Sequence, residues 1–431
     1  MNNQRDKQGD NQGNNQGDKN KNMKSALVLL TALGTQIGNT APQPKLVAHE
    51  WGTFTSLQGS NGEVQEGLYH EEESLPGFVH GRDPLHEQRL RPGPQPGHTP
   101  PPCRGKCFEY GTPAETPLAV TQKMETPVIY FYSDQEQRIQ VDVGFPQGII
   151  TQYYPNPISF NPPIGGVSSL SGGNVSFAVD LLKSPLNLPA VDSSNVYAPA
   201  RNVHADFIKS GNENERFIFY RGLGNFSTTL QVTSGSPGVG TLRLSNRGKE
   251  AIPAVFLVNV TSSGGSIQLL GNISGGNDLL VNAKRLISFR SEAQPLCQFM
   301  LKADQLLTSA LTDTGLYQSE AQAMTDTWKK SYFKTPGLRV LYILPREETD
   351  RILPLRIQPQ PQELVRTMVG RVEVLLSEDE IELLALIHKK GEAFFDVTQL
   401  GRFGEAKLRR VLQLATDSRD QLTIQDLLSR F

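Results

Sequence analysis

Cysteine is scarce in this sequence, and clustered positive charge is absent. The 431 residues include 3 cysteines, and the formal net charge is -2 at pH 7. A nucleic-acid-binding surface needs grouped lysine and arginine, so we expect no nucleic-acid partner. A zinc site built on cysteine needs a second pair of ligands, and the only closely spaced pair is Cys103 and Cys107.

The sequence also lacks the local motifs of several large enzyme classes. It contains no G-x-S-x-G elbow and no Walker A loop. Gly222 and Gly224 lack the third glycine of a dinucleotide fingerprint. His49 and Glu50 do not open an H-E-x-x-H zinc motif, because the second histidine position is Thr53. Local motifs therefore assign no reaction class and no cofactor.

Apolar residues form only a short run near the N-terminus. Lys24 is followed by the segment 25–33, an apolar stretch of about nine residues that is typical of a signal peptide. A bilayer span takes about 20 apolar residues, so this run is too short to cross a membrane. We predict a signal peptide over 23–41 and a periplasmic or secreted protein without a transmembrane anchor after cleavage. The alternative is a buried strand or helix of the core.

Polar residues dominate the positions before this run. Residues 1–22 have no apolar side chain after the first residue, so they cannot bury enough surface to offset chain entropy. We expect them to be disordered, or not translated if synthesis begins at Met23. In an oxidising compartment, Cys103 and Cys107 could close a local disulfide. Cys297 would then remain as a buried thiol.

Strand patterns dominate the middle of the chain. Residues 45–55 alternate between two faces, with His49 and Trp51 on one face and Glu50 on the other. Many short strands with turn residues between them indicate an antiparallel, sandwich-like architecture. The further strands predicted from residue 127 onward are 127–132, 138–145, 149–154, 175–181, 217–220, 229–233, 241–245, 254–260, 267–270 and 286–289.

Helical periodicity begins after residue 294. Tyr317, Ala321, Met324 and Trp328 recur at spacings of four, three and four, which predicts an amphipathic helix. A stripe of this kind is more typical of core packing than of a ligand site. Strand patterns return once more before the C-terminal part, at 338–344, 352–357 and 369–376.

The last part of the sequence is predicted to be helical and to pack on the sandwich. Ser377 and Glu380 form a capping box, which predicts a helix that ends at Gly391. Two more helices should follow. The expected fold is mostly β with α: a first strand and a long loop region rich in proline, glycine and histidine over 42–122, an antiparallel β-sandwich-like core over 123–293, a mixed α/β part over 294–376 and a helical C-terminal part over 377–431.

Four segments resemble those of a family of bacterial proteins. The segments are 49–55 (HEWGTFT), 123–132 (KMETPVIYFY), 216–224 and 338–344. The family is uncharacterised and predicted to be exported, so the resemblance implies export and no particular activity. It runs from His49 to about Glu380, and no functional residue can be transferred from it.

Five of the seven histidines lie within the first hundred residues, among several carboxylates. His49, His70 and His80 are the candidate metal ligands of this group, to which His86 and His98 also belong. Imidazole with carboxylate is a usual ligand set for zinc, and such an ion could activate a water for hydrolysis. The alternative is a solvated loop that is simply rich in these residues.

A second candidate group combines carboxylates with cations near strand ends. Glu50 or Glu125 could act as a general acid or base while Arg221 holds an anionic or polar substrate. Lys123 and Tyr220 lie beside these residues in the sequence and could contact the same ligand. The alternative is a buried structural pair of Glu125 with an arginine.

Aromatic residues add a third possibility. Trp51, Tyr153 and Tyr154 could form a platform for a sugar, and packing in the core or in a turn is the alternative. Taken together, the sequence predicts an exported protein of the cell envelope that binds or scaffolds a small-molecule, glycan or protein ligand. The second hypothesis is an extracytoplasmic hydrolase, metal-assisted in one version, that uses histidine and glutamate near the mature N-terminus.

Overall fold

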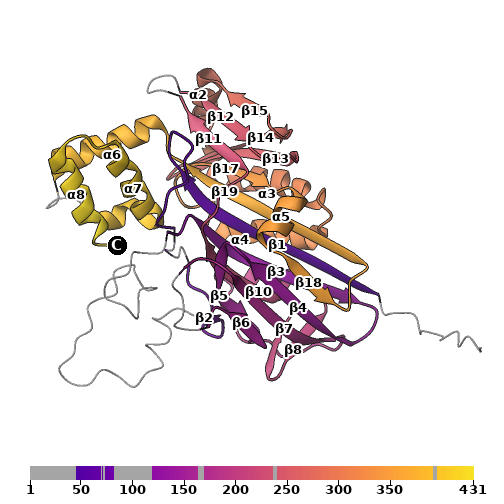
Figure 1. Ribbon diagram of the computed structural model, residues 1–431. Coiled ribbons are helices and arrows are strands. Elements are labelled where there is room, and N and C mark those ends of the chain that lie inside the picture. Colours follow the sequence, from indigo (N-terminus) through magenta and orange to yellow (C-terminus); the bar gives the residue numbers. More distant parts are fainter. Residues whose placement is uncertain are drawn as a thin grey trace, which may run out of the picture. The chain divides into compact units, whose positions relative to one another are not determined.

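The computed structural model describes residues 45–68, 70, 73–81, 119–163, 169–235, 240–391 and 396–431 (Figure 1). The predicted signal segment, residues 1–22 and the Cys103–Cys107 pair lie outside these ranges. None of the helices inside them combines the length and the apolar character that a membrane span requires.

The central layer is one large, mostly antiparallel sheet. Its ten strands, counted within the described ranges, lie between residues 46 and 374. In spatial order they are β16 (Gln294–Pro295), β14 (Gly264–Ile273), β13 (Ile252–Val260), β17 (Gly337–Ile343), β19 (Glu363–Val374), β1 (Leu46–Gln58), β3 (Gln122–Ser133), β10 (Ile218–Gly224), β5 (Gly148–Tyr154) and β2 (His80–Gly81).

Two smaller sheets lie on one face of the large sheet (Figure 1). The larger of them consists of β18 (Leu355–Gln358), β4 (Gln137–Phe145), β7 (Gly173–Leu182), β8 (Phe207–Ser210) and β9 (Glu213–Glu215), with β6 (Ser159–Asn161) paired to β7. The other consists of β11 (Leu230–Ser234), β12 (Leu242–Asn246) and β15 (Asp278–Val281).

Alternating side chains build the core between these sheets. Ile139, Val141 and Val143 of β4 are buried and belong to one apolar cluster with Ile129 and Phe131 of β3. Burying side chains of this size is worth roughly 1.5–3 kcal/mol each. The predicted antiparallel, sandwich-like core is therefore confirmed.

Helices cover the opposite face of the large sheet. Ala321, Met324 and Trp328 are buried in a second cluster with Trp51 of β1, which confirms the predicted helix. The elements on this face are α3 (Leu296–Thr312), α4 (Gln318–Lys330) and the short helix η1 (Ala198–Asn202).

The C-terminal part is helical, as predicted, and has an apolar cluster of its own. It consists of α6 (Ser377–Lys390), η3 (Val397–Phe403), α7 (Gly404–Leu414) and α8 (Ser418–Leu428). Phe403 and Ala406 also pack with Leu57 of β1 and Leu375 in a small third cluster. The C-terminal helices therefore pack against one end of the large sheet.

The predicted capping box at the start of α6 is shifted by one residue. The carboxylate of Asp379, not that of Glu380, accepts the backbone N–H of Leu376 at 3.0 Å. Glu380 is buried instead and accepts hydrogen bonds from Arg410 and Ser60, both at 2.7 Å. The acidic residue expected at the cap therefore joins α6 to α7 and to the loop after β1.

Three other predictions are wrong. Residues 286–289 are not a strand but part of α2 (Ala283–Ser291), whose buried Leu286 and Phe289 are three residues apart on one helical face. Residues 346–352, the start of the predicted 352–357 strand included, form α5 (Arg346–Ile352). Cys297 is exposed at the start of α3 rather than buried.

Candidate functional site

Strand β1 presents its predicted residues to two different layers. Ala48 and Phe54 belong to the sandwich core, whereas Trp51 belongs to the cluster under the helices. Because successive side chains of a strand point to opposite faces, Glu50 lies on the sandwich side and His49 on the helical side. The two residues therefore cannot share a ligand.

Glu50 is enclosed in a buried ion pair. Its carboxylate accepts a hydrogen bond from Arg366 at 2.6 Å and another from the hydroxyl of Tyr220. Arg366 also contacts Asp350 at 2.7 Å. Burial alone would lower the pKa of Arg366, but the adjacent Glu50 carboxylate raises it. Glu50 and Tyr220 are thus structural partners, and both side chains are fully buried.

His49 belongs to a separate buried group. Its Nδ1 lies 2.7 Å from the carboxylate of Glu320, which also accepts the hydroxyl hydrogen bond of Tyr132 at 2.6 Å. The ring of Tyr317 lies 4.4 Å from the imidazole. Burial and the Glu320 charge raise the pKa of Tyr132. This arrangement joins β1 and β3 to α4, and His49 is fully buried.

The candidate metal ligands contact three different carboxylates. His49 contacts Glu320, His70 lies 3.4 Å from Glu405, and His80 contacts Glu213. Among the residues that the structure describes, no three histidine, cysteine or acidic side chains are grouped closely enough to hold a metal ion. The structure therefore does not bring His49, His70 and His80 together as one site.

The aromatic candidates and Arg221 lie in packed surroundings. Trp51 is buried, with the Tyr130 ring 6.4 Å away. Tyr154 packs against Phe78 at 4.8 Å, and burial together with nearby carboxylates raises its pKa to about 12. The guanidinium of Arg221 is buried over the ring of Phe219. No open platform for a sugar is formed by Trp51 and Tyr154, both of which are less than 5% exposed.

Glu125 lies in a dense polar network at the end of β3. Its carboxylate accepts hydrogen bonds from Thr55 at 2.6 Å, Tyr332 at 2.7 Å and Arg402 at 2.7 Å. Burial alone would raise the pKa of Glu125, but Arg402, Lys123 and Arg371 together hold it well below its usual range. The arginine that pairs with this carboxylate comes from the C-terminal part, and the buried structural pair is the interpretation that fits.

The register separates Glu125 from His49. Glu125 pairs with Thr53 on β1, whereas His49 pairs with Tyr130. Four residues of strand correspond to about 13 Å, so the two side chains cannot face one small substrate. Lys123 is directed elsewhere, because its amino group donates to the backbone oxygen of His70 at 2.7 Å.

A second buried charge group continues from this network. Glu373 accepts a hydrogen bond from Arg371 at 2.7 Å and lies 3.1 Å from Arg339. The guanidinium of Arg371 lies 4.0 Å from the ring centre of Tyr332. Since Tyr332 also binds Glu125, the two groups form one continuous arrangement of buried charges at this end of the sheet.

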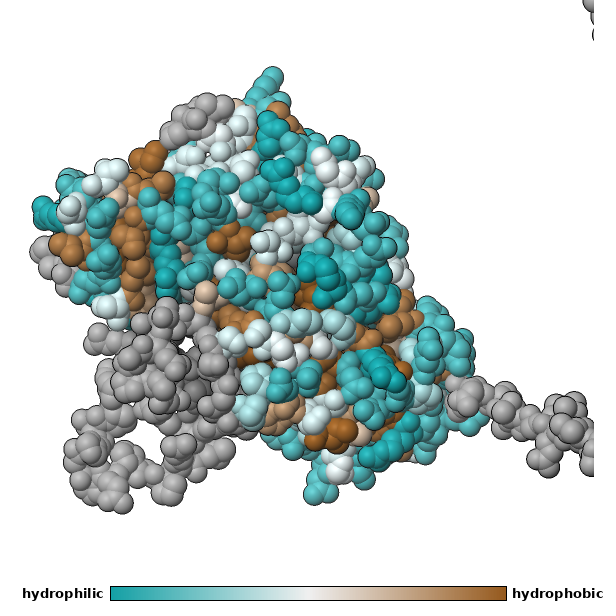
Figure 2. Space-filling model, viewed as in Figure 1, coloured by the Kyte–Doolittle hydropathy of each residue, from teal (hydrophilic) through white to brown (hydrophobic). Residues whose placement is uncertain are grey.

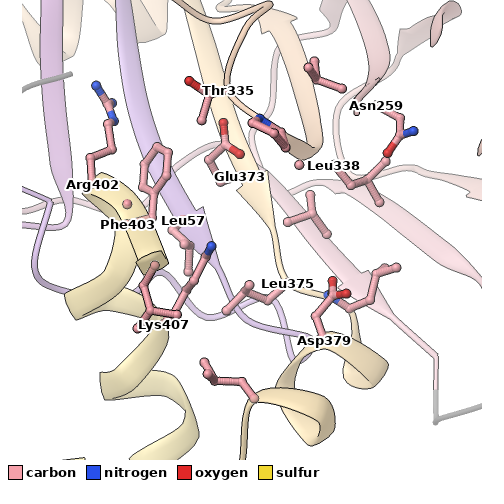
Figure 3. Close-up of a pocket in the computed structure, with 18 of the residues that line it drawn as sticks. Leu57, Asn259, Thr335, Leu338, Glu373, Leu375, Asp379, Arg402, Phe403 and Lys407 are labelled. Atoms are coloured by element: carbon pink, nitrogen blue, oxygen red, sulfur yellow. The ribbon is translucent and has the colours of Figure 1, made fainter. Parts of the chain in front are cut away.

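A pocket of about 700 Å³ opens beside these charges, between the sheet end and the C-terminal helices (Figure 3). Much of its wall is apolar: Leu57, Val260, Leu338, Leu375, Leu400 and Phe403. The polar lining includes Asn259 of β13, Glu373 of β19, Asp379 of α6, Arg402 of η3 and Lys407 of α7. Five elements that are far apart in sequence therefore contribute to one concave site.

Lys407 is the distinctive residue of this pocket. Figure 3 shows its amino group directed into the space between Leu57, Phe403 and Leu375. It forms no hydrogen bond or ion pair with any residue of the described ranges. Burial lowers its pKa, and the more distant carboxylates of Glu373 and Asp379 only partly oppose that effect.

Asp379 lies across the pocket from Lys407, and its pKa is shifted in the opposite direction (Figure 3). Burial raises its pKa, although the Leu376 N–H and Arg290 favour the charged form. The pocket thus holds an amine and a carboxyl group that are both displaced toward their neutral forms. Perturbed groups of this kind in a cleft mark a candidate functional site.

Sequence reasoning did not identify Arg371, Glu373, Arg402 or Lys407. Nothing in the spacing of residues connects Glu125 with Arg402, which is 277 positions away. One signal was present, because Phe403, Lys407 and Val411 are four residues apart and thus share the inner face of a helix. A lysine on an otherwise apolar face is a visible anomaly.

Comparison with protein families and with curated proteins assigns no function to this pocket. Neither the family models nor the curated proteins that were searched give a match to the chain. The geometry described above is therefore the basis for a function.

Proposed function

We propose that this chain is an exported protein that binds a small organic acid in the pocket beside Lys407. The observation that carries the proposal is a half-buried lysine that faces a cavity and has no ion-pair partner in the described ranges. An ammonium group that is removed from water without a partner is costly. A ligand that supplies a carboxylate would remove this cost, because it would complete the missing pair.

The other charged residues of the wall favour the same ligand. Arg402 is paired with Glu125, and Glu373 is paired with Arg371. These pairs neutralise one another, and Lys407 adds a positive charge to the pocket in its protonated form, which a bound carboxylate would favour. A further cation, Arg290, lines the pocket and is exposed. Asp379 opposes these cations when it is ionised, but burial raises its pKa and favours its neutral form, so an anionic ligand group is favoured over a neutral or cationic one.

The apolar wall defines the rest of the ligand. Leu57, Leu375 and Phe403 surround the Lys407 amino group and cannot hydrogen-bond a polar chain through their side chains. Small-molecule sites commonly measure about 300–1,000 Å³, and the pocket falls in this range. The ligand we propose thus has one carboxylate and a short hydrocarbon body.

A binding comparison tests this proposal. Straight-chain carboxylates of four to eight carbons and the alcohols of the same lengths are titrated into the protein by calorimetry. We expect the carboxylates to bind at least tenfold more tightly than the alcohols, a difference of about 1.4 kcal/mol. Equal affinity for the two series would contradict the role of Lys407.

A matched pair of variants isolates that role. Lys407→Met keeps the length and apolar stem of the side chain but removes its charge, and it should lower carboxylate affinity at least tenfold. Lys209→Met removes an exposed lysine of β8, which is not among the lining residues, and should leave the affinity unchanged. Tight carboxylate binding by Lys407→Met would overturn the proposal.

Export is supported by the signal-like segment 23–41 and by the resemblance to exported proteins. Mass spectrometry of the mature N-terminus, on protein recovered from a bacterial host, tests it. We expect the mature chain to begin between residues 34 and 42. A mature protein that retains residues 1–33 would show that the segment is not cleaved.

A further inference from the structure

We infer that Lys407 captures the carbonyl group of an oxo acid as a reversible imine, which makes the pocket a covalent binding site. The inference rests on the proposed function, because it assigns a reactive group to the same ligand. Three observations support it: an amine without a partner in the described ranges, apolar surroundings, and a carboxyl group in the same pocket that can transfer protons.

The first requirement is an unprotonated amine. Lysine is a weak nucleophile in water because it is almost entirely protonated, and an apolar pocket activates it by favouring the neutral form. Burial lowers the pKa of Lys407 in this way. Lys329 shows the contrast: it lies 2.7 Å from Asp304, and this contact helps to raise its pKa.

The second requirement is a group that moves protons. Asp379 lines the same pocket, and its raised pKa favours the protonated carboxyl form that donates a proton. Its backbone contact with Leu376 holds the carboxyl at the start of α6. From the opposite side of the pocket, this carboxyl group can serve through one water as general acid when the product water leaves and as general base when water returns.

The chemical step balances without an oxidant or a reductant. The lone pair of Lys407 Nζ forms a bond to the carbonyl carbon, and the C=O π electrons move to oxygen. A proton passes from nitrogen to that oxygen, which gives a carbinolamine. Asp379 then protonates the hydroxyl through an intervening water, the C–O bond breaks to release water, and the nitrogen lone pair forms the C=N bond. The iminium product gains a positive charge while Asp379 becomes a carboxylate, so a ligand carboxylate has a counter-charge at the Lys407 nitrogen.

Reductive trapping on the full-length wild-type protein tests this inference. The probes are butanal and 4-oxobutanoate, each with sodium cyanoborohydride, which transfers hydride to an iminium carbon and leaves a stable secondary amine. Peptide mass mapping then gives the modification rate of each lysine. We expect Lys407 to be modified at least tenfold faster than the exposed Lys209, with 4-oxobutanoate reacting faster than butanal.

The overturning result is a rate at Lys407 equal to or below that of Lys209. If butanoate binds in the same preparation while Lys407 is not modified preferentially, the imine is wrong and the proposed function stands. If butanoate does not bind and neither aldehyde reacts preferentially, both fail. Because the readout is a ratio within the wild-type protein, it does not depend on the folding of any variant.

Two variants separate charge from nucleophilicity. Lys407→Arg keeps the positive charge but offers no amine, so it should bind butanoate and show no trapped adduct in this pocket. Lys407→Met should lose both properties. An adduct elsewhere in the pocket-lining peptides of Lys407→Arg, formed at the wild-type rate, would assign the reactive group to another residue.

Discussion

Glu125 is a buried carboxylate whose partners come from distant parts of the chain. Thr55 is on β1, Tyr332 follows α4, and Arg402 is in η3 just before α7. Removing one member of such a buried pair leaves the other charge uncompensated, which is costly. The Glu125 side chain therefore links the C-terminal helices to the sheet, and its role is to stabilise the fold.

Replacing Arg402 tests how strongly the stability of the fold depends on its ion pair with Glu125. We predict that Arg402→Met lowers the free energy of unfolding by about 3–5 kcal/mol, because it leaves the Glu125 charge buried without its main counter-ion. Urea denaturation measures the change. The double variant Arg402→Met with Glu125→Gln should recover part of the loss, and a double variant as unstable as the sum of the singles would contradict the pairing.

The same pair makes stability depend on pH. The pKa of Glu125 is lower in the folded protein than in the unfolded chain. A group of this kind contributes its full stability above its unfolded pKa, about 4.3, and loses it as pH falls through the folded pKa. We predict that the wild-type protein loses stability on acidification below about pH 4 more steeply than Glu125→Gln. The measurement is the melting temperature of each protein from pH 2 to 7. An equal decrease of the two melting temperatures over this range would contradict the prediction.

At the scale of the residue, the sequence indicated Glu50 and Glu125 as candidate acid–base residues but did not identify the arginines that pair with them. Both residues were visible because a charged side chain stands out in an apolar strand. Arg366 and Arg402 were not, because a pairing between distant positions leaves no periodic trace in one sequence. The pocket was missed for the same reason, since its polar wall is assembled from five separate elements.

Helix α6 shows how one element ends. Gly391 has φ 65° and ψ -177°, a region that side chains rarely adopt, and its N–H bonds to Ile387 at 2.8 Å. The predicted end of this helix was correct because glycine marks such a cap. The start was displaced by one residue, since three consecutive acids can each serve as the capping carboxylate and packing decides among them.

A substitution at this cap should be destabilising through the backbone alone. We predict that Gly391→Ala lowers stability by about 1–3 kcal/mol, because the φ and ψ angles suit only glycine. An added Cβ meets nothing closer than 3.9 Å, so steric contact is not the cause. Thermal unfolding measures the loss. Gly77→Ala, at a position with open space and no positive φ, should be neutral, and equal effects at both sites would refute the explanation.

The presence of a helix was predicted more accurately than the residues at which it begins and ends. Helix α4 was clear because its apolar stripe is regular, whereas α2 was mistaken for a strand because its apolar run is short. Figure 2 shows apolar side chains reaching the surface over the C-terminal helices, where Ile381 is 51% and Leu422 is 67% exposed. Such exposure weakens the contrast between inner and outer faces that periodicity depends on.

At the scale of the whole molecule, the C-terminal helices and the sheet should unfold together. Both tryptophans are buried in the apolar cluster between the large sheet and the helices that cover it. Tryptophan fluorescence therefore reports on the unfolding of this layer. Far-ultraviolet circular dichroism also reports on α6, α7 and α8. Because Glu125–Arg402 and Glu380–Ser60 join the two regions, we predict coincident urea transitions by both methods. An earlier transition in circular dichroism alone would show that the helices melt separately.

The fold class followed from the sequence, but the strand order did not. Alternating side chains identify strands and the buried face, and they say nothing about which strands become neighbours. The pairing of β1 with β19 is the clearest case, since it is parallel while the neighbouring pairs β1–β3 and β17–β19 are antiparallel. Only the long-range packing of both sheet faces determines it.

This pairing has a consequence for biosynthesis. The centre of the sheet consists of the first strand of the folded unit and a strand that starts at Glu363, so a ribosome must release most of the chain before the two can meet. Contacts of such sequence separation form slowly, since the intervening loop must first be closed. The centre of the large sheet therefore stays unpaired in a nascent chain until synthesis has passed β19, and a sheet left incomplete in this way is easier to thread through a narrow translocation channel.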